Sequence, residues 1–173
     1  RIRHIIGRET GETEMPIRLG MVGGGEGAFS GAVHRIAARL DGQYALTAGA
    51  LSSDAARAKA SAAAIGIAAD RSYGDFREMA AAEAAREDGI DAVAIVTPNH
   101  MHFPVAEAFL EAGIHIICDK PLTTSLDDAK ALAALVRETG LVFALTHNYT
   151  GYPMVRQARQ MVAAGELGQI RGV

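Results

Sequence analysis

Residues 17–28 read IRLGMVGGGEGA, an apolar run of strand length that leads straight into glycines. A helical pattern of residues begins at Ala28. Gly23, Gly25 and Ala28 satisfy the spacing G-x-G-x-x-G/A that opens dinucleotide-binding βαβ units. In such units the first glycine makes the tight turn, the second lets a pyrophosphate approach the backbone, and the third position keeps helix and strand close. Together with Gly27, these residues therefore predict a phosphate-binding loop at the N-terminus of a helix.

Outward from this stretch, apolar strands alternate with helices. This alternation predicts α/β architecture, a doubly wound parallel sheet of the Rossmann dinucleotide-binding type. In the first expected helix, apolar residues recur on one face, as on the buried side of an amphipathic helix (Ala32, Ile36, Ala37 and Leu40). The expected strands are 17–22, 44–51, 91–96, 114–118 and 141–146, and the expected helices are 28–40, 55–65, 75–86, from after Asn99 to about 112, 125–139 and 153–164.

Composition limits the possible functions. The 173 residues suit one domain and carry a net charge of -3, which argues against a nucleic-acid partner. The one cysteine, Cys118, forms no internal disulfide, which fits a reducing compartment, and we expect a cytoplasmic protein. No apolar run approaches the roughly 20 residues that span a bilayer, so no membrane partner is expected.

The end of the second expected strand bears on the choice of cofactor. NAD enzymes usually place an acidic residue there for the ribose hydroxyls, whereas this chain has Ser52 and Ser53. Arg57, one turn into the next helix, is able to pair with a 2′-phosphate, so the pattern slightly favours NADP over NAD. Asp54 remains open between two roles, a ribose contact and a helix N-cap.

The strand over 91–96 ends in TPNHMH at 97–102. Because ligands bind beyond the carboxyl ends of parallel strands, Thr97, Pro98 and Asn99 are expected to lie beside the glycine loop. The alternation of His100 and His102 suggests a metal pair, but no further ligands form an obvious set with them, so no metal is expected.

The next strand ends in CDKP at 118–121. A lysine and an aspartate at a strand's carboxyl end, before a proline, are well placed to act on a ligand. Lys120 is expected to donate a hydrogen bond to a substrate oxygen. Asp119 accepts from a ribose or holds Lys120. Cys118 is interpreted as buried packing rather than as a nucleophile.

These motifs occur in a recognisable order, with MVGGGEG at 21–27, VTPNHMH at 96–102, FLEAGIHIICDKP at 109–121 and LTHNY at 145–149. Together they resemble the N-terminal nucleotide-binding domain of the glucose–fructose oxidoreductase, inositol dehydrogenase and rhizopine catabolism family (Gfo/Idh/MocA). Members of that family bind NAD or NADP in this domain and act on CH–OH groups of sugars, cyclitols and related small molecules.

The resemblance assigns roles to several residues. It implies that Lys120 is the catalytic lysine and that Asp119, a shorter acid, replaces the usual ribose-binding Glu. The Thr97-Pro98-Asn99 loop and His102 match cofactor-lining positions, and a cis bond before Pro121 is implied. Asn148 matches the asparagine that follows the sixth strand and faces the nicotinamide. Ser52 and Arg57 match positions that hold the phosphate in NADP-dependent members.

The resemblance also implies a domain layout. Residues 1–14 are expected to be a disordered extension, 15–165 the NAD(P)-binding domain, and 166–173 the start of a substrate domain. The whole protein is then an NAD(P)-dependent dehydrogenase or reductase with a sugar or polyol substrate and a homo-oligomeric state. Two alternatives remain open: a dinucleotide-binding regulatory module without turnover, and an NAD-dependent glycosidase of the same family.

Overall fold

The computed structural model describes residues 15–172. The extension expected over residues 1–14 lies outside the described residues, and so does Val173. The boundaries of the expected strands and helices agree with the structure to within about three residues.

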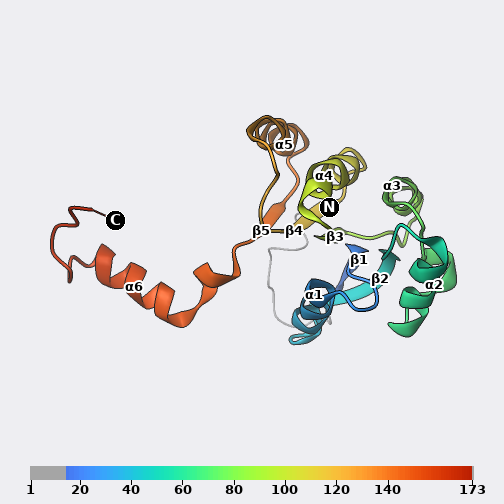
Figure 1. The fold of residues 1–173 in the computed structure, drawn as a ribbon, viewed down its shortest axis with the longest axis horizontal. Helices are drawn as coiled ribbons and strands as arrows, with labels where there is room; N and C mark the ends of the chain where they lie inside the picture. Colours follow the sequence, from blue (N-terminus) through green and yellow to red (C-terminus); the bar gives the residue numbers. More distant parts are fainter. Residues whose placement is uncertain (1–14, 173) are drawn as a thin grey trace.

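The described chain folds around one parallel sheet of five strands in the order β2-β1-β3-β4-β5 (Figure 1). Every neighbouring pair is parallel, which confirms the predicted doubly wound sheet of the Rossmann type. The chain moves outward from β1 to β2 and then returns to the other side of β1 as β3. In open sheets, ligands bind beyond the carboxyl ends of the strands at this reversal. The strands are β1 (Ile17–Gly23), β2 (Tyr44–Ala50), β3 (Ala92–Val96), β4 (His115–Asp119) and β5 (Phe143–Thr146).

Helices cover the sheet on two sides. Figure 1 shows α3, α4 and α5 on one side of the sheet, α1 on the other, and α6 extending away from the sheet. Short 3-10 turns join the larger elements: η2 (Ala69–Arg71), η3 (Asn99–Met101) and η4 (Asn148–Gly151). The helices are α1 (Phe29–Arg39), α2 (Ala55–Ala64), α3 (Phe76–Ala85), α4 (His102–Glu111), α5 (Leu126–Thr139) and α6 (Pro153–Ala163).

The central strand β3 contributes to an apolar core on each face of the sheet. Val93 and Ile95 belong to the cluster that includes Phe109 of α4. Ala92 and Ala94 alternate with them and belong to a second cluster, which includes apolar residues of β1 and α2. A strand buried on both faces needs apolar residues at every position, which explains the uninterrupted AVAIV of β3.

From the resemblance, Asn148 was expected to follow a sixth strand. The strand that precedes Asn148 is instead the fifth, β5, in this sheet. The segment over 67–73 contributes only an isolated bridge, between Ser72 and Gly49 of β2. The 3-10 turn η2 occupies most of that segment and leaves too little extended chain for a further strand.

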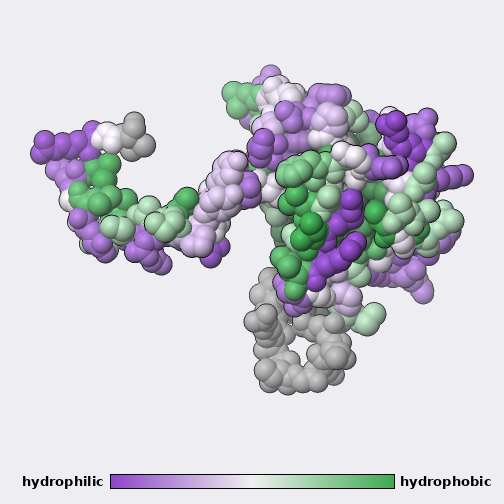
Figure 2. Space-filling model, turned by 60° about the horizontal axis from the view of Figure 1, so that its bottom comes forward, coloured by the Kyte–Doolittle hydropathy of each residue, from purple (hydrophilic) through white to green (hydrophobic). Residues whose placement is uncertain are grey.

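The predicted buried face of α1 is wrong. Ile36 and Leu40 are 63% and 81% exposed, and Ala32 and Ala37 are exposed as well. Apolar side chains accordingly gather on the outer surface in Figure 2. The side of α1 that faces the protein interior is instead made of small and polar residues, Gly31, His34 and Arg35. The periodicity of apolar residues therefore predicted the wrong side of this helix as buried.

A buried carboxylate anchors the amino end of β3. Glu83 of α3 accepts hydrogen bonds from both Nε and Nη2 of Arg71. It also accepts from the hydroxyl of Tyr73 at 2.8 Å and from the backbone N–H of Ile90 at 3.2 Å. Burial, with Glu83 alongside, raises the pKa of Tyr73 to about 12. This network joins η2, the η2–α3 connection, α3 and the start of β3.

The buried position of Cys118 in β4 leads to a test of the fold. Burial, with a smaller contribution from the charge of Asp119, raises the pKa of the Cys118 thiol to about 12. We expect the folded chain to resist a thiol-specific chromogenic disulfide at about pH 8, because the thiolate is the reactive form. Unfolding in guanidinium should release one reactive thiol per chain. Rapid stoichiometric labelling of the folded chain would contradict the structure, and Cys118→Ala gives the background rate.

Candidate functional site

A cleft of about 750 Å³ lies at the carboxyl edge of the sheet. Four segments line this cleft: the β1–α1 loop, the end of β2 with the start of α2, the η2–α3 connection with the start of α3, and the turn after β3. Three of them meet because parallel strands deliver their following loops to the same edge. The residues from the sequence prediction that line the cleft are Gly23, Gly25, Ala28, Ser52, Ser53, Arg57, Thr97 and Pro98.

The glycine loop turns where the sequence predicts. Gly23 has a φ of +79°, and a Cβ there would lie 2.9 Å from the carbonyl oxygen of Val96. Only glycine accepts both conditions without strain. The structure gives Gly25 a further reason for being glycine: its Cβ would lie 2.7 Å from the carbonyl oxygen of Leu51 and 3.0 Å from Oγ of Ser61. Its missing side chain therefore lets the loop lie against the end of β2 and against α2.

A close contact between α1 and the loop is made by Gly31, which lies outside the predicted motif. A Cβ on Gly31 would lie 2.5 Å from Cα of Gly24. Ala28 is instead the N-cap residue of α1 and lines the cleft. Gly27 has a φ of +80° with open space around its Cα, and it does not line the cleft.

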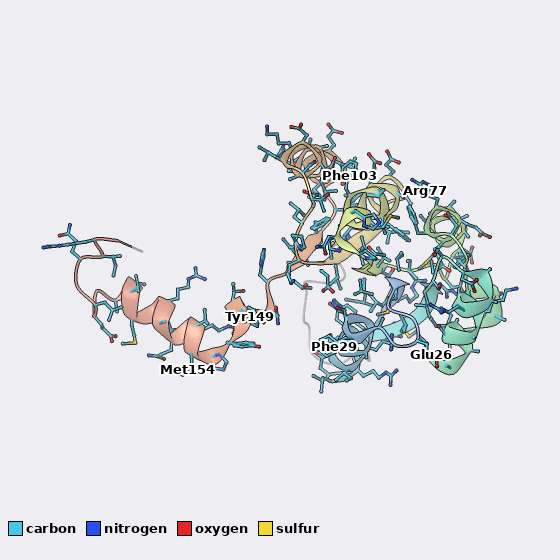
Figure 3. All side chains as sticks on the ribbon, viewed as in Figure 1. Glu26, Phe29, Arg77, Phe103, Tyr149 and Met154 are labelled. Atoms are coloured by element: carbon cyan, nitrogen blue, oxygen red, sulfur yellow. The ribbon has the colours of Figure 1, made fainter. Side chains whose placement is uncertain are left out.

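The loop and the next turn leave hydrogen-bonding groups available for a ligand. Glu26, labelled in Figure 3, donates its backbone N–H to Oγ of Ser61 at 3.1 Å. The N–H of Gly25 has no hydrogen-bond acceptor among residues 15–172. The hydroxyl of Thr97 is buried beside the cleft and likewise lacks a partner within that range. An amide hydrogen and a hydroxyl left unpaired in this way fit the oxygens of a dinucleotide.

The end of β2 settles the role of Asp54. Its carboxylate accepts the backbone N–H of Arg57 at 2.7 Å, so Asp54 is the N-cap of α2 and does not line the cleft. Ser52, Ser53 and the Arg57 side chain are therefore the polar groups that this segment presents to the cleft.

His102 is buried behind the cleft. Its Nδ1 lies 2.6 Å from the carbonyl oxygen of Pro121, and its Nε2 lies 3.1 Å from that of Thr97. Because each ring nitrogen faces a backbone carbonyl oxygen, His102 is not available to a metal shared with His100. The ring instead joins the turn after β3 to the turn after β4. Asn99 starts η3 and is exposed beside the cleft lining rather than part of it.

Asp119 is the last residue of β4 and Lys120 follows it, and neither residue lines the cleft. Oδ1 of Asp119 lies 2.8 Å from Nε2 of His34 on α1 and accepts from the hydroxyl of Thr146 at 2.9 Å. The hydrogen bond with His34 is the main reason that the pKa of Asp119 is lowered. Asp119 is therefore held by α1 and β5, while Lys120 is exposed. The Lys120–Pro121 bond is cis, as the resemblance implied.

Asn148 lies in η4, immediately after β5, and is exposed. Figure 3 shows the neighbouring Tyr149 and Met154 where the chain leaves the sheet.

One wall of the cleft was missed by the sequence prediction. Gly74 and Asp75 of the η2–α3 connection line it, together with Phe76 at the start of α3. Asp75 caps α3 by accepting the N–H groups of Arg77 and Glu78, and the Arg77 guanidinium lies 4.4 Å from the centre of the Phe76 ring. The aspartate before a helical run signals the cap, but no local pattern tells which connection reaches the carboxyl edge.

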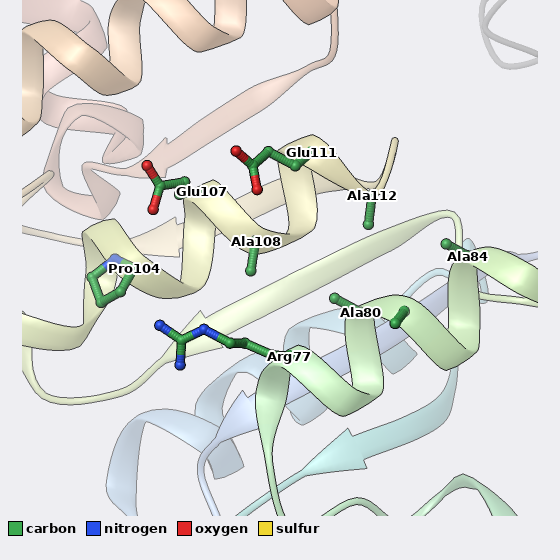
Figure 4. A pocket seen from close by; sticks show the side chains of 9 residues that line it. Arg77, Ala80, Ala84, Pro104, Glu107, Ala108, Glu111 and Ala112 are labelled. Atoms are coloured by element: carbon green, nitrogen blue, oxygen red, sulfur yellow. The ribbon is translucent and has the colours of Figure 1, made fainter.

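A second hollow, of about 410 Å³, lies between α3 and α4 (Figure 4). Alanines such as Ala80, Ala84 and Ala108 form much of its lining, with Arg77 and the carboxylate of Glu107 beside them. No residue of the predicted site lies there, so the larger cleft is the candidate site.

The parallel sheet, its reversal at β1 and the glycine loop beside an open cleft define a Rossmann dinucleotide-binding domain. Residues 17–149 match the family model described as an oxidoreductase family with an NAD-binding Rossmann fold, Gfo/Idh/MocA, and the chain belongs to that family. This confirms the resemblance found in the sequence.

Three similar proteins illustrate the match. An oxidoreductase from Sinorhizobium meliloti is 59% identical, with a TM-score of 0.86, over 91% of this chain and 44% of that one. An inositol dehydrogenase homolog from Azotobacter vinelandii, solved with NADH and myo-inositol, is 43% identical, with a TM-score of 0.88, over 91% of this chain and 41% of that one. Levoglucosan dehydrogenase from Pseudarthrobacter phenanthrenivorans is 31% identical over 89% of this chain and 39% of its own length. The chain thus spans about two fifths of the length of the curated relatives it matches.

No helix within 15–172 is both long and apolar enough to cross a membrane. No group of three or more His, Cys, Asp or Glu in the same range is arranged to hold a metal ion.

Gly31→Ala tests the contact between α1 and the loop. Alanine favours a helix interior over glycine by about 1 kcal/mol, but its methyl group would displace the backbone of Gly24. We expect a net destabilisation of about 1–3 kcal/mol in chemical denaturation, as for other overpacked sites. Gly151→Ala is the matched control, because a Cβ there meets open space. An unchanged unfolding midpoint for Gly31→Ala would contradict the contact.

Proposed function

We propose that this chain binds NADP in preference to NAD and that the whole protein transfers hydride between the nicotinamide and a hydroxyl-bearing carbon of a sugar, a cyclitol or a related small molecule. The observation that carries the proposal is the composition of the cleft. It combines the unpaired N–H of Gly25 with the unpaired hydroxyl of Thr97, and Ser52, Ser53 and Arg57 lie at its β2 end. The membership of the family and the inositol dehydrogenase homolog solved with NADH support a nicotinamide dinucleotide in this position.

The phosphate groups are assigned to two parts of the cleft. The pyrophosphate lies against Gly23 and Gly25 at the N-terminus of α1, where N–H groups and the helix dipole favour an anion. The 2′-phosphate of NADP lies at Ser52, Ser53 and Arg57. The one carboxylate of that segment, Asp54, is engaged in capping α2, so it is not presented to a ribose as in typical NAD enzymes.

The reacting end of the cofactor lies toward β4 and β5. When bound, the nicotinamide supplies or accepts hydride at its C4. Lys120 donates a hydrogen bond to the reacting substrate oxygen, and Asn148 faces the nicotinamide. Thr97, Pro98 and Asn99 line the cofactor, and His102 contributes by holding the backbone of Thr97 and Pro121. Asp119 contacts the ribose from the position that His34 gives it.

The proposal for the rest of the protein is based on the length of its relatives. Residues 15–165 form the dinucleotide-binding domain, and 166–173 lead into a substrate domain, because the matched relatives are more than twice as long as the match. The exposed Tyr149, Tyr152 and Met154 face that domain or a second copy in a homo-oligomer. The single, unpaired Cys118 favours a reducing, cytoplasmic compartment.

Calorimetric titration with NADPH and NADH tests the choice of cofactor. We expect NADPH to bind more tightly, and Arg57→Ala to weaken NADPH by about tenfold or more through loss of a charge-assisted bond to the 2′-phosphate. The affinity for NADH should stay unchanged. Lys59→Ala is the matched control, because Lys59 is exposed on the same helix and does not line the cleft. Tighter binding of NADH would reverse the assignment to NADP, and a chain that binds neither would end the dinucleotide proposal.

Lys120→Met tests the chemical role of Lys120. With NADP as oxidant and a panel of cyclitols and aldoses as substrates, we expect turnover to fall by about 10²–10⁴-fold, the usual contribution of a positioned acid or base. The affinity for NADPH should persist, because Lys120 lies outside the cleft lining. Lys130→Met, an exposed position on α5, is the control. Turnover retained by Lys120→Met would remove the catalytic assignment. Binding of NADPH without turnover by the unmodified protein would favour a regulatory module.

A further inference from the structure

The carbonyl group of Gly24 has a specific partner behind the glycine loop. Gly24 is buried, and its oxygen accepts a hydrogen bond from Nη1 of Arg35 at 2.8 Å. Arg35 lies on the inward side of α1, and the same nitrogen is 3.7 Å from the sulfur of Met21. The guanidinium thus contacts the loop from the side of α1 and does not line the cleft.

This bond fixes the orientation of one peptide group. The Gly24–Gly25 peptide is trans, so its carbonyl and its N–H point in opposite directions within one plane. Because the Gly24 carbonyl points at Arg35, the Gly25 N–H points away from it. That N–H has no acceptor in residues 15–172, and Gly25 lines the cleft. Glycines at both positions restrict the backbone dihedral angles around this peptide less than other residues would.

The charge of Arg35 is also uncompensated. Within the described range, Arg35 forms no ion pair with a carboxylate, and the charged group that acts on it most clearly is another cation, Arg39. Partial burial, with the repulsion from Arg39, lowers the pKa of Arg35. Charged groups removed from water are normally paired. A half-buried cation behind an anion-binding loop gains its counter-charge when a phosphate arrives.

We propose that Arg35 is a positioning residue of the phosphate loop: it holds the Gly24–Gly25 peptide so that the Gly25 N–H is directed at the pyrophosphate of a bound dinucleotide. This inference rests on the proposed dinucleotide-binding function. Arg35 acts through the backbone and does not itself contact the ligand.

The test compares ligands that do and do not contain a pyrophosphate. NADPH and ADP-ribose contain one, whereas adenosine 2′-monophosphate does not. We expect Arg35→Met to weaken NADPH and ADP-ribose by about tenfold to a hundredfold, the range for lost hydrogen bonds to charged groups. The affinity for adenosine 2′-monophosphate should change by less than about twofold. Arg39→Met, an exposed position one turn further along α1, removes the same charge and should leave all three affinities unchanged. Arg35→Lys keeps a charge and a donor and should recover part of the loss.

The outcomes separate this inference from the function it rests on. An unchanged affinity of Arg35→Met for ADP-ribose would overturn the positioning role while leaving dinucleotide binding in place. An equal loss for all three ligands, or the same loss in Arg39→Met, would also overturn it. A wild-type chain that binds no dinucleotide would remove the proposed function and the inference together.

If Arg35→Met does not fold, the NMR resonance of the Gly25 amide proton in the unmodified chain tests the inference instead. A downfield shift of its proton on addition of ADP-ribose, and none on addition of adenosine 2′-monophosphate, is the expected result. An unmoved resonance with bound ADP-ribose overturns the inference.

Discussion

The candidate site depends on a contact between two backbones. Gly24 and Gly31 lie so close that neither tolerates a side chain toward the other, and this closeness brings the first turns of α1 against the loop. Only at that distance does Arg35 reach the Gly24 carbonyl from α1. His34 next to it reaches Asp119 at the end of β4. A wider separation would remove both bonds at once, so the two glycines set the geometry of the phosphate loop and of the carboxylate beside Lys120.

Much of the architecture follows from local patterns in the sequence. Buried parallel strands are continuous apolar runs, and Ser125, Asp54 and Asp75 mark helix starts through their capping side chains. The face of α1 was the exception, because periodicity counts apolar residues and this helix packs through a glycine. Its inward polar side chains find their partners on β4 and in the loop, at sequence separations of 85 and 11 residues. The periodicity of apolar residues does not reveal such partners.

The site divides in the same way. Gly23 ends β1, Ser52 and Thr97 come shortly after β2 and β3, and Arg57 lies in the first turn of α2. The rule that loops gather at the carboxyl edge is therefore enough to place them in the cleft. The η2–α3 connection escaped prediction because its path over the sheet is decided by tertiary packing. His102 has a chemically versatile side chain, but its ring is used to join two backbone turns. A residue type indicates possible chemistry, and its partners decide whether that chemistry is available.

The carboxylate of Glu83 lies below the cleft, among Arg71, Tyr73 and the N–H of Ile90. Tyr73 is followed directly by Gly74, Asp75 and Phe76, the wall of the cleft that comes from the η2–α3 connection and the start of α3. The position of that wall therefore depends on Glu83, which is buried and does not line the cleft. A natural variant at Glu83 would therefore impair ligand binding even though Glu83 does not contact the ligand. The cause of the defect would be missed if only the ligand-contacting residues were compared.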